Sequence, residues 1–205
     1  MNVSVRNSAR LGWAALRALL VLTVVCGLLY PLAVTGVAQA AFHDKANGSV
    51  VEEDGKQVGS ALIGQSWNKG GKKDGKPDPK WFQPRPSHSG YDPLATGSSQ
   101  LGADDPTLVK AVRKAKAEVA RFNGVPASEV PKDAVTGSAS AIDPHISPAY
   151  ARIQTDRVAR ANGLSEGAVE RLVDQYTEGR TAGFLGEPHV NVLQLNLAVR
   201  RLAEE

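Results

Sequence analysis

The strongest constraint in this sequence is an apolar run without one charged side chain, from Ala18 to Phe42. At about 1.5 Å per residue a helix of this length rises roughly 37 Å, and the hydrocarbon core of a bilayer is about 30 Å thick. We therefore predict a transmembrane helix over residues 18–42, with room for some tilt. Tyr30-Pro31 falls within this span and predicts a kink there.

The charges that flank the run predict its orientation. Three arginines and no acid lie before it, whereas a histidine, an acid and a lysine follow it directly. Positive residues are retained on the cytoplasmic side. We therefore expect residues 1–17 inside the cell and residues 43–205 outside it. The arginines are Arg6, Arg10 and Arg17, and the flank that follows is His43-Asp44-Lys45.

A cleavable export signal is the alternative interpretation of this region. Arginines, an apolar stretch and the small-x-small tripeptide Ala38-Gln39-Ala40 match the secretory pattern. The uncharged stretch is longer than the roughly 7–15 residues of a typical signal core, which favours a retained anchor. Both interpretations export the rest of the chain, and they differ in whether it stays tethered.

Composition limits the function of the exported part. The whole chain has 24 Lys and Arg against 21 Asp and Glu, with a pI near 9.0. Three of the basic residues precede the run, which leaves 21 of each sign in the exported part. The basic pI thus reflects the topology signal, and we expect no nucleic-acid partner. Cys26, the one cysteine, lies within the run, so the exported part has no disulfide and no thiolate metal site.

The exported part is predicted to be one domain. Residues 43–57 are polar and are expected to link the anchor to a domain over residues 58–205. A short strand is predicted at Gly59–Gln65, bounded by glycines. Residues 68–80 contain five lysines and three glycines, and they are predicted to form an exposed loop because they bury no apolar area.

Capping residues and a 3.6-residue periodicity predict the helices of this domain. Asp105-Pro106 and Ser147-Pro148 each pair an N-cap residue with a proline at the first helical position. A strand or extended segment is predicted over residues 133–143. The fold class is therefore α+β: one N-terminal transmembrane helix followed by a single mixed, helix-rich extracytoplasmic domain. The predicted helices cover residues 106–123, 148–162, 165–176 and 190–203.

The domain lacks the motifs of common enzyme classes, because it has no P-loop, no dinucleotide-binding glycine pattern, no GxSxG and no HExxH. Two acid-Pro-His tripeptides remain, Asp143-Pro144-His145 and Glu187-Pro188-His189. Two imidazoles and two carboxylates suit zinc if their loops meet. An exported metal-binding or hydrolytic domain is therefore the alternative function. The competing interpretation is that each acid and histidine caps a turn before a helix.

Arg85 lies between Pro84 and Pro86, whose fixed φ angles hold its side chain in a reproducible direction. One interpretation is a positioned contact to a carboxylate or carbonyl of a partner. The other is an ion pair within its own domain. Trp81 and Phe82, just before it, are expected to anchor this extended segment to the core.

Several motifs, taken in order, resemble the C subunit of the bacterial potassium-transporting P-type ATPase, the Kdp system, over nearly the whole chain. Residues 68–80 look like an insertion relative to that family, and Ala141 and His189 stand where glycine and arginine are expected. The motifs are Leu29–Leu32, Gly59–Gln65, Phe82–Ser87 with Tyr91-Asp92, Val135–Ser140, Asp143–Tyr150 and Gly183–Leu193.

The resemblance implies a non-catalytic, single-pass accessory subunit in the cell membrane, needed for assembly and activity of an ATP-driven potassium uptake complex. The implied partners are a channel-like potassium-carrying subunit, a P-type subunit that hydrolyses ATP and a small single-span subunit. It also implies a catalytic chaperone that raises the ATP affinity of the hydrolysing subunit, so ATP is suggested by resemblance alone. Because only residues 1–17 are expected on the ATP side, our topology favours a cap at the external potassium entrance.

Five residues are expected to contact a partner or to brace the loops that do. Arg85, Asp143 and His145 lie in proline-fixed loops, where a rigid contact costs little entropy. Glu187 and Asn191 belong to the last of the motifs. No catalytic residue and no metal ligand is assigned.

Overall fold

The computed structural model describes residues 5–72 and 75–204, and these divide into two units between Val50 and Val51. Lys73 and Asp74 of the predicted lysine-rich loop lie outside the described residues. The first unit is helical: α1 (Val5–Val24), a π-helical turn η1 (Val25–Leu29), α2 (Tyr30–Ala41) and the short α3 (His43–Ala46). Among the described residues, Asn7–Ala41 is the one helix long and apolar enough to cross a membrane, with none of its apolar window buried.

Pro31 does not break this helix; it follows a π-helical turn. Proline lacks an N–H, and its ring crowds the carbonyl four residues earlier, here that of Gly27. The N–H of Tyr30 donates to the oxygen of Val25, five residues back, so one wider turn absorbs the conflict without ending the helix. A π-helical turn thus stands directly before the position where the sequence predicted a kink.

A β-hairpin opens the second unit, where the sequence predicted a linker. β1 (Val50–Glu53) pairs with β2 (Lys56–Ser60). Asp54 and Gly55 between them have φ of 52° and 71°, the left-handed pair that a two-residue hairpin turn requires. The expectations of a linker over 43–57 and a strand over 59–65 were wrong in detail. The strand ends at Ser60, where a turn begins with a hydrogen bond from the N–H of Ile63 to the oxygen of Ser60. Gly64 then lies against the backbone of Asp143, and its N–H donates to the oxygen of Ile142 at 2.7 Å.

The predicted helix at residues 106–123 is confirmed. α4 (Pro106–Asn123) begins after Asp105, whose carboxylate accepts the N–H of Thr107. It ends at Gly124, which has a left-handed φ of 72°. The lysine-rich segment contains the short 3₁₀ turn η2 (Lys69–Gly71), and residues 81–105 form turns, bends and irregular structure. Two further 3₁₀ turns follow α4: η3 (Ala127–Glu129) and η4 (Lys132–Ala134).

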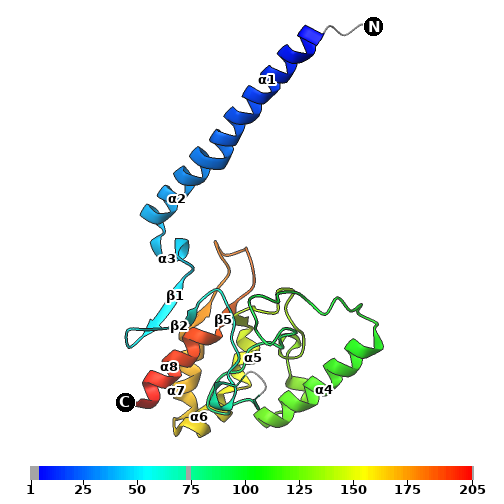
Figure 1. The fold of residues 1–205 in the computed structure, drawn as a ribbon. Coiled ribbons are helices and arrows are strands. Elements are labelled where there is room, and N and C mark those ends of the chain that lie inside the picture. The colour runs from blue at the N-terminus through cyan, green and yellow to red at the C-terminus, as the bar shows by residue number, and fades with distance from the viewer. Residues whose placement is uncertain (1–4, 73–74, 205) are drawn as a thin grey trace. The chain divides into compact units, whose positions relative to one another are not determined.

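A three-stranded antiparallel sheet, in the order β3-β5-β4, forms the centre of the unit. β3 (His145–Ile146) and β4 (Thr177–Glu178) both pair with β5 (His189–Asn191). Helices separate these strands along the chain; α8 contacts β5, and α7 contacts α8 in turn (Figure 1). The helices are α5 (Pro148–Arg152), α6 (Thr155–Asn162), α7 (Glu166–Gln175) and α8 (Val192–Glu204).

Three predicted boundaries in this part were wrong. The segment 133–143 holds no strand; it follows η4 as turns and bends, because its glycine, serines and alanines carry little side-chain surface to pack in a sheet. The helix predicted over 148–162 is two helices, broken where the Gln154 side chain turns into the core. The last helix starts at Val192, since residues 189–191 pair as β5. The mixed, helix-rich fold class behind one long apolar helix is confirmed.

The apolar core combines β5, α6, α7 and α8 with Phe82, which is fully buried as predicted. Val158, Val169, Val190 and Leu195 are likewise fully buried. Trp81 packs against this cluster, so the extended segment before Arg85 is anchored as expected. Burial of these side chains is the dominant favourable contribution to the fold.

A set of buried side chains, here called the buried polar cluster, fastens residues 79–83 to the helices. The amide of Asn196 accepts the N–H of Phe82 at 2.8 Å and donates to its carbonyl at 3.0 Å. The amide of Gln154 does the same for Gln83, at 2.7 and 3.1 Å. Each amide thus makes the two hydrogen bonds that a neighbouring strand would make to the same residue. These bonds satisfy backbone groups that burial would otherwise leave unpaired. The cluster consists of Gln83, Asn123, Gln154, Arg157 and Asn196.

Arg157 is the centre of this cluster. It donates to the carbonyls of Pro79 and Trp81, to Asn123 Oδ1 at 2.9 Å and to Gln154 Oε1 at 2.8 Å. Its guanidinium also lies over the ring of Phe122, 4.4 Å from the centroid. Burial lowers the pKa of Arg157 to about 10, so it remains charged at neutral pH and its charge is shared among oxygen acceptors.

Candidate functional site

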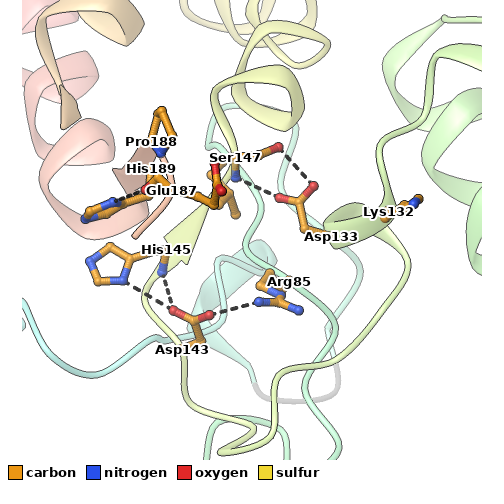
Figure 2. Close-up of a pocket in the computed structure, with 10 residues that line it drawn as sticks. Arg85, Lys132, Asp133, Asp143, His145, Ser147, Glu187, Pro188 and His189 are labelled. Carbon is orange, nitrogen blue, oxygen red and sulfur yellow. Dashed lines mark hydrogen bonds and ion pairs between the residues drawn. The ribbon is translucent and has the colours of Figure 1, made fainter. Parts of the chain in front are cut away.

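Arg85 is used within its own domain. Nη1 donates to Asp143 Oδ2 at 3.0 Å, Nε to the carbonyl of Thr136 at 3.4 Å and Nη2 to the carbonyl of Gly137 at 3.3 Å. All three nitrogens are therefore engaged, although a quarter of the side chain is exposed. These residues, the arginine brace (Arg85, Thr136, Gly137 and Asp143), hold the irregular 136–143 segment against the proline-flanked one (Figure 2).

Asp143 connects the brace to β3. Its Oδ1 accepts the backbone N–H of His145 at 3.0 Å and lies 3.3 Å from Nδ1 of the His145 ring. Burial works to raise the pKa of Asp143, but the two hydrogen bonds from His145 and the charge of Arg85 outweigh it and hold the pKa below its usual value. Asp143 is thus a carboxylate at neutral pH with partners on both oxygens.

The two acid-Pro-His tripeptides do meet, because β3 and β5 are neighbours. His145 pairs with Asn191 in register, and His189 is two residues from Asn191, which puts both rings on the same face. The rings lie edge to face with centroids 4.5 Å apart, as Figure 2 shows. His189 Nδ1 lies 3.0 Å from the carbonyl oxygen of Glu187, two residues earlier.

The two histidines make an edge-to-face ring contact. His145 Nδ1 lies against Asp143 Oδ1 and His189 Nδ1 against the carbonyl of Glu187, so these two nitrogens face separate oxygens of the protein. Over residues 5–72 and 75–204, no group of three or more His, Cys, Asp or Glu is placed to hold a metal ion. The pair instead joins β3 to β5 beside the arginine brace.

Glu187 and Asn191 have opposite environments. The Glu187 side chain is 79 % exposed and accepts from Arg180 Nη2 at 2.7 Å. Asn191 is buried; it donates to the carbonyl of Ala61 at 2.8 Å, and its Oδ1 accepts the N–H of Gln194 in the first turn of α8. Asn191 is therefore an N-cap and a tie to the 61–64 turn, whereas Glu187 faces solvent.

Other contacts of this site were not singled out from the sequence. Asp133 accepts the backbone N–H and the hydroxyl of Ser147 at 2.7 and 2.9 Å, which fixes the N-cap of α5. Tyr91 donates its hydroxyl to the carbonyl of Arg85, and burial raises its pKa. Ser87 donates to the carbonyl of Ala141 at 2.6 Å. The Phe82–Ser87 and Tyr91-Asp92 motifs were the available signal, but no local rule pairs their side chains with residues about 50 positions away.

Part of this site lines an open depression of about 510 Å³ (Figure 2). The lining residues are Arg85, Lys132, Asp133, Asp143, His145, Ile146, Ser147, Glu187, Pro188 and His189. Most of the charges around it are paired: Arg85 with Asp143, and Glu187 with Arg180. A shallow surface with paired charges and rigid loops is suited to a protein contact rather than to a small-molecule reaction.

The sequence of the whole chain matches a family model described as K+-transporting ATPase, c chain, over residues 12–201. The chain belongs to this family, KdpC. Relatives named potassium-transporting ATPase KdpC subunit include one from Streptomyces avermitilis, 51 % identical with 98 % of both chains covered. Another, from Streptomyces coelicolor, is 52 % identical and covers 98 % of this chain and 97 % of its own. One from Mycobacterium tuberculosis is 48 % identical over 92 % of this chain and 96 % of its own.

Membership confirms the resemblance drawn from the motifs. The chain is a subunit of a potassium-transporting ATPase of the KdpC family, with one apolar helix suited to a membrane. The depression, the arginine brace and the histidine pair are thus features of a subunit of this ATPase.

Proposed function

We propose that this chain is a non-catalytic, single-pass accessory subunit of an ATP-driven potassium uptake complex, with its domain outside the cell membrane. There the domain covers the potassium entrance of a channel-like subunit. The observation that carries the orientation is the arginine flank: Arg10 and Arg17 lie on the N-terminal part of the apolar helix, and a nearly balanced flank follows it. In this arrangement α1 and α2 pack among the helices of a P-type ATP-hydrolysing subunit, a channel-like subunit and a small single-span subunit.

A cap at the entrance acts by position and by local charge. Selection of potassium needs rings of carbonyl oxygens, which a channel-like partner supplies. The exported part is formally neutral, so acids grouped on one face raise the local cation concentration only over a short distance, and salt weakens the effect. Rigid, internally braced loops allow such a cap to dock without a large ordering cost.

The chaperone role that the resemblance implies acts, in this topology, through the assembled complex. ATP is cytoplasmic, and only the short segment before the apolar run lies on that side. We therefore expect no ATP binding by the chain alone, and a change in the ATP affinity of the complex when the chain is added. Calorimetry with the purified chain, followed by ATPase assays of the complex with and without it, separates these outcomes.

Orientation is tested by labelling with a membrane-impermeant maleimide. In a Cys26→Ala background, Thr96→Cys in the domain and Ser8→Cys before the run provide matched exposed sites. On intact cells we expect Thr96→Cys to be labelled and Ser8→Cys to be labelled only after the cells are opened. The reverse pattern overturns the external placement.

Assembly is tested by purifying the full chain from its native membrane in mild detergent. We expect a multi-span protein and a P-type ATPase to accompany it in fixed ratio. Recovery of the chain alone, beginning at Ala41, means a cleaved signal and overturns the anchored-subunit proposal.

A further inference from the structure

The loop over residues 179–188, between β4 and β5, exposes two adjacent apolar side chains. Phe184 is 71 % exposed and Leu185 is 55 % exposed. An exposed leucine is ordinary on a protein surface, but an aromatic side chain beside it at the tip of a loop forms an apolar contact point. No described residue of its own domain covers this tip.

The backbone of this loop is fixed although its tip is exposed. Thr181 and Leu185 exchange two backbone hydrogen bonds, of 2.9 and 3.0 Å, and the N–H groups of Gly183 and Phe184 donate to Arg180 and Thr181. Gly183 and Gly186 flank the apolar pair with φ of 81° and 80°, which glycine adopts without strain. The chain thus holds an aromatic side chain outward in a preformed geometry, which lowers the ordering cost of binding.

Charges around the tip distinguish a protein from a lipid surface. Arg180 pairs with Glu187 at the base of the loop. Glu178, just before the loop, adds a second acid, whose carboxylate lies 3.8 Å from Nε2 of His189. Loops that insert into bilayers use lysine and arginine to hold anionic headgroups. Here the one arginine of the loop is paired with Glu187, so the loop offers no unpaired cation to an anionic headgroup.

We propose that the 179–188 loop is a docking loop whose Phe184 and Leu185 insert into an apolar pocket with a basic rim on the external face of the channel-like subunit. The paired Arg180 and Glu187, with Glu178, form the polar rim around this apolar anchor, the usual anatomy of a binding hot spot. The inference rests on the proposed function, which supplies the partner, and it adds which residues of this chain make the contact.

A photocrosslinking amino acid at position 184 tests the contact in the full complex. Leu94, a loop residue that is 95 % exposed, provides the matched control position. We expect the probe at 184 to give one adduct, of this chain with the multi-span subunit, and the probe at 94 to give at most a trace of it. An adduct with lipid, with a second copy of this chain or with no protein at all overturns the proposal.

Substitution gives the quantitative test. The double variant Phe184→Ser with Leu185→Ser is expected to lower the fraction of chain that co-purifies with the complex at least tenfold after dilution, whereas Leu94→Ser leaves it unchanged. Thermal unfolding of the full chain in detergent checks that both variants fold. If the folded double variant stays in the complex, the docking-loop proposal is wrong, and the proposed function stands. If the unaltered chain brings down no partner, both proposals fall.

Discussion

The buried polar cluster and the 179–188 loop both depart from the usual distribution of side chains. The cluster has polar groups inside the domain, and the loop has apolar groups on its surface. The cluster places an arginine and several amides in the interior, with Arg157 only 6 % exposed and Gln154 and Asn196 fully buried. The loop instead places Phe184 and Leu185 in solvent. In the cluster, every described polar contact is made to another group of the same domain. In the loop, the backbone hydrogen bonds are made within the loop, and the two apolar side chains are not part of the apolar core.

This difference shows which region stabilises the domain and which is available to a partner. Buried polar groups are costly unless they are paired, so a fully satisfied cluster fixes one arrangement of the chain around it. Exposed apolar groups on a rigid loop add little to the stability of the fold. They remain available to be buried by a second molecule. The arginine brace lies between these extremes, because its side chains are about a quarter exposed.

Arg157→Ala tests the buried extreme. It removes a cation and leaves Asn123 Oδ1 and the carbonyl of Pro79 without their Arg157 donor, whereas Gln154 Oε1 and the carbonyl of Trp81 each keep a hydrogen bond from Gln83. We expect a loss of about 3–5 kcal/mol in the free energy of unfolding, measured by denaturant titration of the full chain in detergent with tryptophan fluorescence. A loss below about 1 kcal/mol means that water replaces the guanidinium, and the cluster is then not what fixes residues 79–83.

Asp143→Asn tests the intermediate case. The variant keeps one acceptor but loses the charge opposite Arg85, and solvent screens the pair, so we expect a loss of about 1–2 kcal/mol at pH 7. The native pKa of Asp143 lies below its ordinary 3.8. Its contribution to stability is therefore complete above that value and is lost as the pH falls through the native pKa.

The pH dependence separates charge from shape in this variant. Unfolding titrations from pH 7 downward should show the gap between the original chain and Asp143→Asn closing in acid, below about pH 4. A gap that stays constant into acid assigns the loss to altered packing, and the charge of Asp143 then plays no part in the brace.

Ala141 tests whether backbone strain in the braced segment affects stability. It is buried with φ of 62°, a conformation that costs a non-glycine residue about 1–2 kcal/mol. In Ala141→Gly, relief of this strain should offset the lost methyl group and the freer unfolded chain, with a net change within about 0.5 kcal/mol. Ala151→Gly is the control, a buried helical alanine that should lose about 1–2 kcal/mol. Equal losses in both variants mean that position 141 is unstrained.

Phe184→Ser tests the exposed extreme, and its expected effect on stability is the smallest. A side chain that is mostly in solvent makes few contacts, so the free energy of unfolding of the isolated chain should change by less than about 0.5 kcal/mol. Calorimetry of the full chain in detergent measures this. A loss of 1 kcal/mol or more means that the phenylalanine supports its own domain, and the comparison between the two regions then fails.

Local patterns specified much of this molecule. The uncharged apolar run marked the long N-terminal helix, and Asp105-Pro106 with Gly124 fixed both ends of α4. Ser147-Pro148 likewise fixed the start of α5, where Ser147 accepts the N–H of Tyr150. These features depend on residues within one or two turns of each other, so a single sequence is sufficient to identify them.

Tertiary structure decided the rest. β3, β4 and β5 have two or three residues each, too few for a periodic signal, and they exist because strands far apart in the chain pair. The pairing of β3 with β5 brought His145 to His189, and the packing of two irregular segments gave Arg85 three acceptors from residues 136–143. Sequence placed Arg85 between two prolines and left open whether it served a partner or its own domain. Only the folded chain decided it, because a hydrogen bond depends on distance in space and not on separation along the chain.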